Sequence, residues 1–550
     1  MNFFQSRQKV FNLLISLIAI CSIAVLIYIL VLPADPKNAW FLGLSRPRWL
    51  MTTGAFLLCL LSISLVLKTI LRPAWGQHAA DVWSRWLYSK VGMALTFSFS
   101  IFWLLISVWF AMYWRHFVTD QYMLPYLIRF APFMGWFFGV SLLLILGLPF
   151  FRPSLWQDYA ALLVSVLLVF LVDQFTNILE IEQMPWDVRY FYLLAEHGLR
   201  GTNIAPYVYR FATPMLARWL ADVLYLTIFQ AYTIIAISGG ILQLFGIHLL
   251  VRKLGFGLKT SIMIISVVGF TMFNLKFLLF DVSRPDHLAY ILMLLAVLAL
   301  FSQQTVWCVL VSVIGLQFRE LLAVPLAILS LTYFRDWLRN RANLKLWLHI
   351  ALIGVATALA VILPRKLIPV TENTQFVDLQ VPSTLINLIT LPADIWRDSN
   401  LLFVVVGYFL PTFVLLTPQR WRSIWHKLRP YHWFLALYMG LVFLLTLYGG
   451  HDMMRYITYM FIPQVFFLAY LLQEELHPLE IVYLFVVLII FNRIFLPFPV
   501  LDFNANVDFY GGYAEQVDLA SLYRWLEVLG MIIGSGILRM ILNRLKGKTQ

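Results

Sequence analysis

The chain has 550 residues, of which 61% are hydrophobic and only 12% are charged, and its mean hydropathy is +0.82. This composition excludes a soluble globular protein and indicates a polytopic membrane protein. The net charge of +13 does not indicate a nucleic-acid partner, because the basic residues gather in short segments between hydrophobic stretches. The three cysteines all lie inside such stretches, so neither a disulfide framework nor a metal cluster is expected.

Hydrophobic segments along the chain predict an all-α fold, a polytopic transmembrane helical bundle of about 14–16 spans. The predicted spans lie near 10–33, 50–67, 93–114, 131–150, 159–177, 225–251, 261–280, 288–302, 304–317, 321–334, 347–363, 400–417, 432–448, 456–472, 479–494 and 526–542. The loops 335–345 and 420–429 and the tail 544–548 are rich in Lys and Arg. We therefore expect them, and both termini, on the cytoplasmic side of a bacterial cytoplasmic membrane.

Three consecutive segments between 288 and 334 hold only about 14 residues each, fewer than the roughly 20 that cross a membrane alone. They could equally form one span and a broken or re-entrant helix. Either arrangement needs an odd number of crossings, because 281–287 is expected outside and the basic loop 335–345 inside.

The spans divide into two blocks with different loops. Residues 1–155 form an N-terminal block of about four spans, and residues 156–550 form a core. The long outer loops of the core are 178–224, 364–399 and 495–525.

The first long outer loop contains a segment, 187–197, that is amphipathic at helical spacing. Its apolar side holds Val188, Phe191, Leu194 and Ala195, with Asp187, Arg189 and Glu196 elsewhere. We expect a helix lying in the membrane interface. A second such helix is expected to begin after Pro214, with Arg218 and Asp222 on the wet face and Met215, Leu216, Trp219 and Leu220 on the other.

Three charged clusters adjoin hydrophobic segments on the side expected to be non-cytoplasmic. They are 281–287 (Asp-Val-Ser-Arg-Pro-Asp-His), Arg319-Glu320 and 451–455 (His-Asp-Met-Met-Arg). Ionisable groups at membrane depth cost roughly 2.5–3.5 kcal/mol each, so several at one level indicate a functional site. The sequence therefore predicts a site at the outer membrane face.

The outer loop and the second cluster carry a family resemblance. An acidic residue followed by aromatics (Asp187, with Tyr190 and Tyr192), a Tyr209-Arg210 pair before Pro214, and the later Arg319-Glu320 resemble motifs of the GT-C superfamily of membrane glycosyltransferases. That superfamily includes the protein O-mannosyltransferases and the bacterial aminoarabinose transferases. The resemblance covers about 159–542. It implies transfer of a sugar from a polyprenyl phosphate carrier in the lipid bilayer to a glycan, lipid or protein acceptor at the extracytoplasmic face.

The resemblance implies a role for each matching residue. Asp187 would be the catalytic base, and Arg210, Arg284, Arg319 and Arg455 would be candidate clamps for phosphate, because a guanidinium presents a fork of donors that fits phosphate oxygens. The candidate substrate-binding residues are Arg189, Tyr190, His197, Arg210, Asp281, Arg284, Asp286, His287, Arg319, Glu320, His451, Asp452 and Arg455. In the family the catalytic acid lies in the first outer loop, so Asp35 is a rival to Asp187.

Each candidate also has a purely structural interpretation. Arg319-Glu320 and Asp452 with Arg455 could be internal ion pairs. Asp281 or Ser283 could cap a helix that begins at Pro285. Asp187 could likewise cap its own helix, and Tyr190, Tyr192, Tyr207 and Tyr209 could be an interfacial aromatic belt instead of sugar platforms.

No cofactor is expected. Asp281, Asp286 and His287 could bind a divalent cation by chemical type, but their spacing does not support one. The chain lacks a Gly-rich phosphate loop, a Walker motif and a nucleophile elbow, which disfavours an ATP-driven pump or a hydrolase. The alternatives to a glycosyltransferase are a secondary transporter or a lipid or glycan flippase, and a polymerase of lipid-linked glycans.

Overall fold

The computed structural model describes residues 46–88, 156–174, 186–200, 207–224, 226–271, 274–341, 343–373, 414–448, 456–474, 476–492 and 517–547, with shorter pieces at 11–12, 15–16, 18–20, 22–23, 26–27, 176, 204–205 and 494. The predicted spans at 93–114 and 131–150 lie outside the described residues, as does most of the span at 400–417. Asp35, His451, Asp452 and Arg455 lie outside them too.

The described chain is all-α, as predicted, and divides into two compact units at residues 163 and 164. The first unit contains α2 (Arg46–Leu71) and α3 (Pro73–Tyr88), which pack together. The turn between them is tight, because Lys68 lies over the Trp75 ring, 4.2 Å from its centroid. Helix α6 (Trp156–Gln174) runs across the boundary.

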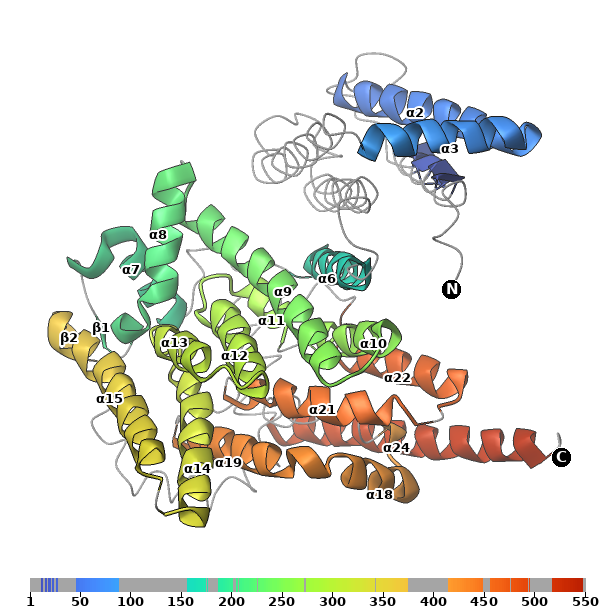
Figure 1. Ribbon diagram of the computed structural model, residues 1–550. Helices are drawn as coiled ribbons and strands as arrows, with labels where there is room; N and C mark the ends of the chain where they lie inside the picture. The colour runs from blue at the N-terminus through green and yellow to red at the C-terminus, as the bar shows by residue number, and fades with distance from the viewer. Residues whose placement is uncertain are drawn as a thin grey trace. The chain divides into compact units, whose positions relative to one another are not determined.

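The second unit holds the remaining elements (Figure 1). Its helices of four residues or more are α7 (Trp186–His197), η5 (Tyr207–Arg210), α8 (Ala212–Leu224), α9 (Ile228–Lys253), α10 (Leu258–Gly269), α11 (Lys276–Phe280), α12 (Asp286–Phe301), α13 (Thr305–Gly315), α14 (Ala323–Arg339), α15 (Leu344–Leu367), α18 (Pro418–Lys427), α19 (His432–Tyr448), α21 (Phe461–Leu471), α22 (Pro478–Phe491) and α24 (Val517–Gly547). The three-residue turns are η4 (Gly198–Arg200), η6 (Glu320–Leu322), η7 (Arg429–Tyr431) and η9 (Thr458–Met460). Two short strands, β1 (Ile204–Ala205) and β2 (Glu372–Asn373), pair in parallel.

The centre of the second unit is α9, which packs against α12 and α10. It begins at a capping box, in which the Thr227 side chain accepts from the Gln230 backbone and the Gln230 side chain accepts from the Thr227 backbone. Small residues allow the close approach: a Cβ added at Gly239 would lie 2.9 Å from the His287 Cβ, and one added at Gly246 would lie 3.0 Å from Leu294. Glycine at these positions lets α12 lie directly against the α9 backbone.

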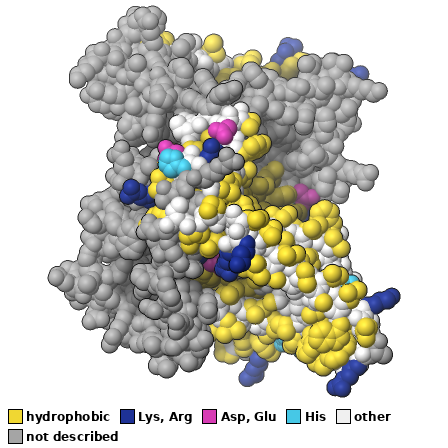
Figure 2. Space-filling view, turned by 90° about the vertical axis from the view of Figure 1, so that its left-hand side faces the viewer, with side chains coloured by type: hydrophobic (Ala, Val, Ile, Leu, Met, Phe, Trp, Pro, Cys, Tyr) yellow, Lys and Arg dark blue, Asp and Glu magenta, His cyan; other side chains and the backbone are white. Residues whose placement is uncertain are grey.

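Five helical stretches of the described chain are long and apolar enough to cross a membrane, and a sixth counts if a bent pair is one span. The five are Thr52–Leu71, Ile228–Lys253, Glu320–Arg339, Leu344–Leu367 and Trp525–Asn543, and the bent pair is α18 with α19, at 59°. Helix α15 exposes Leu348, Leu352 and Leu359. Figure 2, which views the side where α15 lies in Figure 1, shows much of the described surface covered by hydrophobic side chains. The chain is therefore an integral membrane protein.

One predicted span needs correction, and the structure also bears on the alternatives left open for 288–334. The segment 261–280 is not one helix: α10 ends at Gly269, and α11 begins at Lys276. Between 288 and 334, α12 and α13 have only 16 and 11 residues, whereas Glu320–Arg339 is long enough to cross alone. This arrangement agrees with the interpretation of one span beside shorter helices.

Three basic segments lie close together in the second unit, and we call this region the basic end: 252–259, 335–345 and 418–429. Phe256 packs edge-on against Tyr470, which in turn lies near Tyr431. The Arg335 guanidinium lies 5.3 Å from the centroid of the Trp433 ring. Tertiary packing thus brings 335–345 and 418–429, both predicted on the cytoplasmic side, together with 252–259.

Candidate functional site

The outer loop folds as predicted near its start. In α7, Phe191, Leu194 and Ala195 are buried and Arg189 and Glu196 are exposed, which confirms the amphipathic helix. Its inner face is fixed, because the buried Tyr232 hydroxyl donates to the Phe191 carbonyl at 2.9 Å. Asp187 is the second residue of α7, but its side chain lies outside the described residues.

The second predicted interfacial helix, α8, differs in detail. It begins at Ala212, before Pro214, and its buried side consists of Thr213, Pro214, Ala217 and Ala221. Trp219 is exposed together with Asp222, whereas Leu216 and Leu220 pack against buried residues. The small residues are buried because α8 packs against α7 and α9.

Two tyrosines of the loop form a platform. The Tyr190 and Tyr207 rings are stacked with centroids 4.7 Å apart. Beside them is a cavity of about 10 Å³, lined by Tyr190, Leu193, Leu194, Ile204, Tyr207 and Val208. That volume holds about one water molecule. Along the same helix, burial raises the pKa of the Tyr192 hydroxyl, and nearby Glu196 adds to the effect, so Tyr192 is a hydrogen-bond donor at neutral pH.

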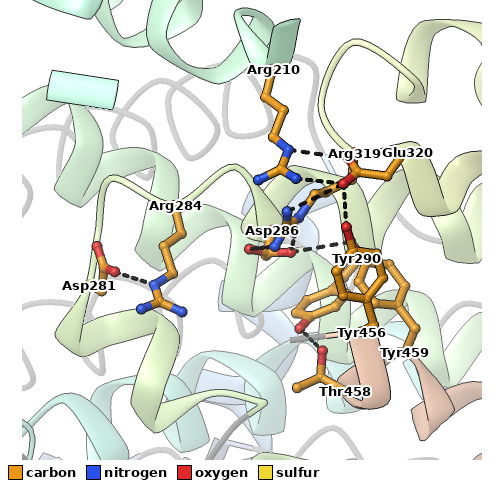
Figure 3. Close-up of polar contacts among 10 residues, drawn as sticks. All are labelled: Arg210, Asp281, Arg284, Asp286, Tyr290, Arg319, Glu320, Tyr456, Thr458 and Tyr459. Atoms are coloured by element: carbon orange, nitrogen blue, oxygen red, sulfur yellow. Dashed lines mark hydrogen bonds and ion pairs between the residues drawn. The ribbon is translucent and has the colours of Figure 1, made fainter. Parts of the chain in front are cut away.

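Below the loop, the Arg319 and Asp286 side chains form a buried ion pair (Figure 3). Arg319 Nε donates to Asp286 Oδ1 at 2.8 Å, and Nη2 donates to Oδ2 at 3.3 Å. Arg319 is fully buried, and the Asp286 side chain is only 3% exposed. This two-point contact offsets the desolvation of both charges, which would otherwise be severe.

A second two-point ion pair, between Arg210 and Glu320, joins the predicted outer loop to the Arg319–Asp286 pair. Arg210, in η5, donates from Nη2 to Glu320 Oε1 at 2.5 Å and from Nε to Oε2 at 3.2 Å. The Tyr456 hydroxyl donates to the same Glu320 Oε1 at 2.5 Å. The Arg319 Nη1 atom lies 3.9 Å from Oε1, so Arg210, Glu320, Arg319 and Asp286 form one continuous series of charges.

The neighbouring residues Arg319 and Glu320 have different principal partners. Arg319 has extended φ and ψ of −154° and 138°, and Glu320 begins the η6 turn that follows it. The buried Arg319 guanidinium contacts Asp286, whereas the Glu320 side chain, which is 41% exposed, contacts Arg210. The Arg319–Glu320 ion pair considered from the sequence is present at 3.9 Å, but each residue has a closer partner, Asp286 for Arg319 and Arg210 for Glu320.

The third pair, Asp281 with Arg284, closes the turn before α12. Ser283 donates to Asp281 Oδ1 at 3.2 Å, and the Arg284 guanidinium lies over the Phe277 ring, 4.1 Å from its centroid. The predicted helix cap is therefore wrong: Pro285 is the N-cap of α12, and no side chain caps it. Asp281 is engaged by Arg284 and Ser283 instead. We call Arg210, Asp281, Arg284, Asp286, Arg319 and Glu320 the buried charge cluster.

Aromatic hydroxyls from α12 and η9 complete the cluster. The Tyr459 hydroxyl donates to Asp286 Oδ1 at 3.4 Å. Tyr290 and Thr458 share a hydrogen bond between their hydroxyls, and the Tyr290 and Tyr459 rings meet edge to face. The sequence did not indicate Tyr290, Tyr456, Thr458 and Tyr459, because a tyrosine in an apolar segment has no spacing that separates it from an ordinary packing residue.

Other polar side chains are buried between the helices and were also missed. Gln243 donates to Asn274 at 2.6 Å, the Lys276 amine donates to the Ile494 carbonyl at 2.9 Å, and His248 contacts Ser261 at 2.7 Å. Each of these contacts involves a polar residue inside a predicted span. A polar residue at membrane depth is a sequence signal that could have identified these positions.

Two predicted histidines, His197 and His287, lie apart from the ion pairs of the cluster. His197 lies 3.8 Å from Glu196 on the exposed part of α7, and both side chains are about half exposed. His287 is buried where α12 meets Gly239. Among the residues that the structure describes, no three His, Cys, Asp or Glu side chains gather as metal ligands.

The cluster combines three guanidinium groups with three carboxylates, so its formal charge is balanced. Its chemical capacity lies in the guanidinium and tyrosine donors that converge near Glu320, since these are the groups that bind phosphate or carboxylate oxygens. Comparisons of the chain with protein-family models, with curated proteins and with solved structures found no match.

Proposed function

We propose that this chain is a membrane glycosyltransferase, which transfers a sugar from a polyprenyl phosphate carrier to a glycan, lipid or protein acceptor at the outer face of a bacterial cytoplasmic membrane. In this proposal both termini are cytoplasmic. Asp187 is the general base that takes the proton from the acceptor, and the buried charge cluster lies at the phosphate side of the reaction.

One observation carries the proposal: Arg210 fixes the outer loop onto the buried charge cluster. Its guanidinium makes a two-point contact with Glu320, while η5, which holds it, packs against α7 through Tyr207 and Tyr190. The loop that contains α7, which begins with Trp186 and Asp187, therefore also contains the Arg210 guanidinium. Sugar transfer from a lipid phosphate needs this combination of a carboxylate and a guanidinium.

The chemistry explains that need. Glycosyl transfer passes through an oxocarbenium-like transition state, in which a carboxylate activates the acceptor while negative charge grows on the departing phosphate. A preorganised guanidinium stabilises the phosphate charge without deprotonating. The lipid carrier requires a site at the membrane face, and α7, amphipathic and partly exposed, is the kind of helix that lies there.

The proposal is tested in membranes that contain the expressed chain and retain lipid, glycan and protein acceptors. Polyprenyl phosphate carrying a radiolabelled hexose or pentose is added, and label is measured in each acceptor fraction. Asp187→Asn is expected to lower transfer by about 100- to 10,000-fold, because the amide keeps the shape but cannot accept a proton. Asp222→Asn, on exposed α8, is the matched control and keeps wild-type transfer.

Two results would contradict the assignment. Full transfer in Asp187→Asn together with loss in Asp35→Asn would move the base to the first outer loop. Absence of transfer from both donors, with uptake of a labelled solute into vesicles, would favour the secondary transporter. The buried Gln243–Asn274 contact and the break between α10 and α11 favour that second candidate, since discontinuous helices with polar groups at membrane depth form transporter sites.

A further inference from the structure

Glu320 differs from every other carboxylate of the buried charge cluster in its exposure. Its side chain is 41% exposed, whereas its partner Arg210 is 11% exposed and the neighbouring Arg319 is fully buried. The Asp281 and Asp286 side chains are 1% and 3% exposed. The donors that meet at Glu320 are thus buried, and the acceptor is the accessible partner.

The donors are arranged around one oxygen. Glu320 Oε1 accepts from Arg210 Nη2 and from the Tyr456 hydroxyl, both at 2.5 Å, and Arg319 Nη1 lies 3.9 Å away. The second oxygen accepts from Arg210 Nε at 3.2 Å. These donors come from η5, the residues before η9, and the turn before η6, so the fold, and no single helix, assembles them.

A guanidinium fork with a hydroxyl beside it binds phosphate oxygens as readily as carboxylate oxygens. We propose that Glu320 is an internal stand-in for a phosphate group, and that a phosphate-bearing ligand binds by displacing the Glu320 carboxylate from Arg210 and Tyr456. The displaced carboxylate turns into solvent, which it already contacts. No covalent bond changes in this exchange.

The charges make the exchange feasible. Arg319 keeps its two-point contact with Asp286 when Glu320 leaves, because that contact uses Nε and Nη2, whereas Glu320 lies near Nη1. Arg210 exchanges one anion for another, so no buried cation is left without a counter-charge, which would be strongly unfavourable. Glu320 thereby keeps the empty site neutral and opposes the binding of weak anions.

The identification of the ligand as the phosphate of a lipid carrier rests on the proposed function, whereas the exchange at Glu320 does not. The test therefore measures binding and not sugar transfer. Purified full-length protein in detergent is titrated calorimetrically with inorganic phosphate and, separately, with a short-chain polyprenyl phosphate.

Glu320→Gln is expected to bind phosphate about 10-fold or more tightly than the wild type, because an amide competes poorly for a guanidinium. Asp336→Asn is the matched control: it removes one negative charge from a side chain that is 43% exposed and paired with Arg335, at the other end of α14. It is expected to leave phosphate affinity unchanged. Adding Arg210→Gln to Glu320→Gln is expected to abolish the gain, whereas adding Arg218→Gln, on α8, is not.

Where Glu320→Gln fails to fold, Glu320→Asp keeps the charge and withdraws the carboxylate by one methylene, and a gain in affinity is again expected. Equal phosphate affinity in the wild type and these Glu320 variants overturns the exchange, as does an equal gain in Asp336→Asn. Tighter binding of the polyprenyl phosphate than of inorganic phosphate supports a lipid headgroup, and equal binding rejects it. Neither outcome depends on Asp187 or on sugar transfer.

Discussion

The buried charge cluster and the basic end of the second unit use the same kinds of ion pair in different surroundings. In the cluster, Arg319 and Asp286 are 0% and 3% exposed, and cations and carboxylates balance. At the basic end, Lys427 and Glu474 are 44% and 19% exposed, and exposed Arg339, Arg422 and Arg429 leave an excess of positive charge. Balance is required where water is excluded, and an excess is tolerated where water solvates it.

The two regions are also linked by α21, which has the buried charge cluster near its start and the basic end near its last turn. Tyr459 precedes α21 and contacts Asp286, whereas Tyr470, near the end of α21, packs against Phe256 and Tyr431 of the basic end. Helix α21 thus connects the buried charge cluster with the basic end. Substitutions that remove one partner should have very different effects at the two places.

The largest effect is expected at Arg319. Arg319→Gln leaves Asp286 buried without its cation and should lower the free energy of unfolding by about 3–5 kcal/mol. Unfolding of the purified protein in mixed micelles, followed by tryptophan fluorescence, measures it. The double variant Arg319→Leu with Asp286→Leu removes both charges and should recover most of the loss. A loss in Arg319→Gln as small as that at an exposed pair would refute the contrast.

An intermediate effect is expected at Arg420, which joins α18 to α22. Its guanidinium makes a two-point contact with Glu480 at 2.8 and 3.0 Å, and the side chains are 16% and 7% exposed. Arg420→Gln should cost about 1–3 kcal/mol, because hydrogen bonds to a partly buried charge are lost. Arg422→Gln, exposed on the same helix, is the control. The same unfolding assay should rank Arg420→Gln between Arg319→Gln and Arg422→Gln.

The smallest effect is expected at Lys427, where Lys427→Gln should change the free energy of unfolding by less than about 1 kcal/mol. Its hydrogen bond to Glu474 lowers the pKa of that carboxyl below the ordinary value of 4.5. The contribution of the pair is therefore present above pH 4.5 and is lost as the pH falls through the lowered pKa. Wild type and Lys427→Gln should thus converge in stability in acid. A difference that persists there would exclude titration of Glu474 as its source.

Local sequence determined the class of the protein and several of its elements. A run of about 20 apolar residues must satisfy its backbone groups within one helix in a membrane, so α9, α15 and α24 could be predicted without their neighbours. The same holds for α7, where apolar residues recur at helical spacing and Phe191, Leu194 and Ala195 are buried. Charge patterning likewise predicted which basic segments share one end.

Only the tertiary structure decided the partners of the charged residues. The sequence marked Arg210, Asp286, Arg319 and Glu320, but it indicated neither the close pair of Arg319 with Asp286 nor that of Glu320 with Arg210. The choice depends on the packing of η5 and α12 around Arg319 and Glu320. Contacts between residues 33 and 110 positions apart leave no periodic signal, because they arise from how helices pack and not from how one helix turns.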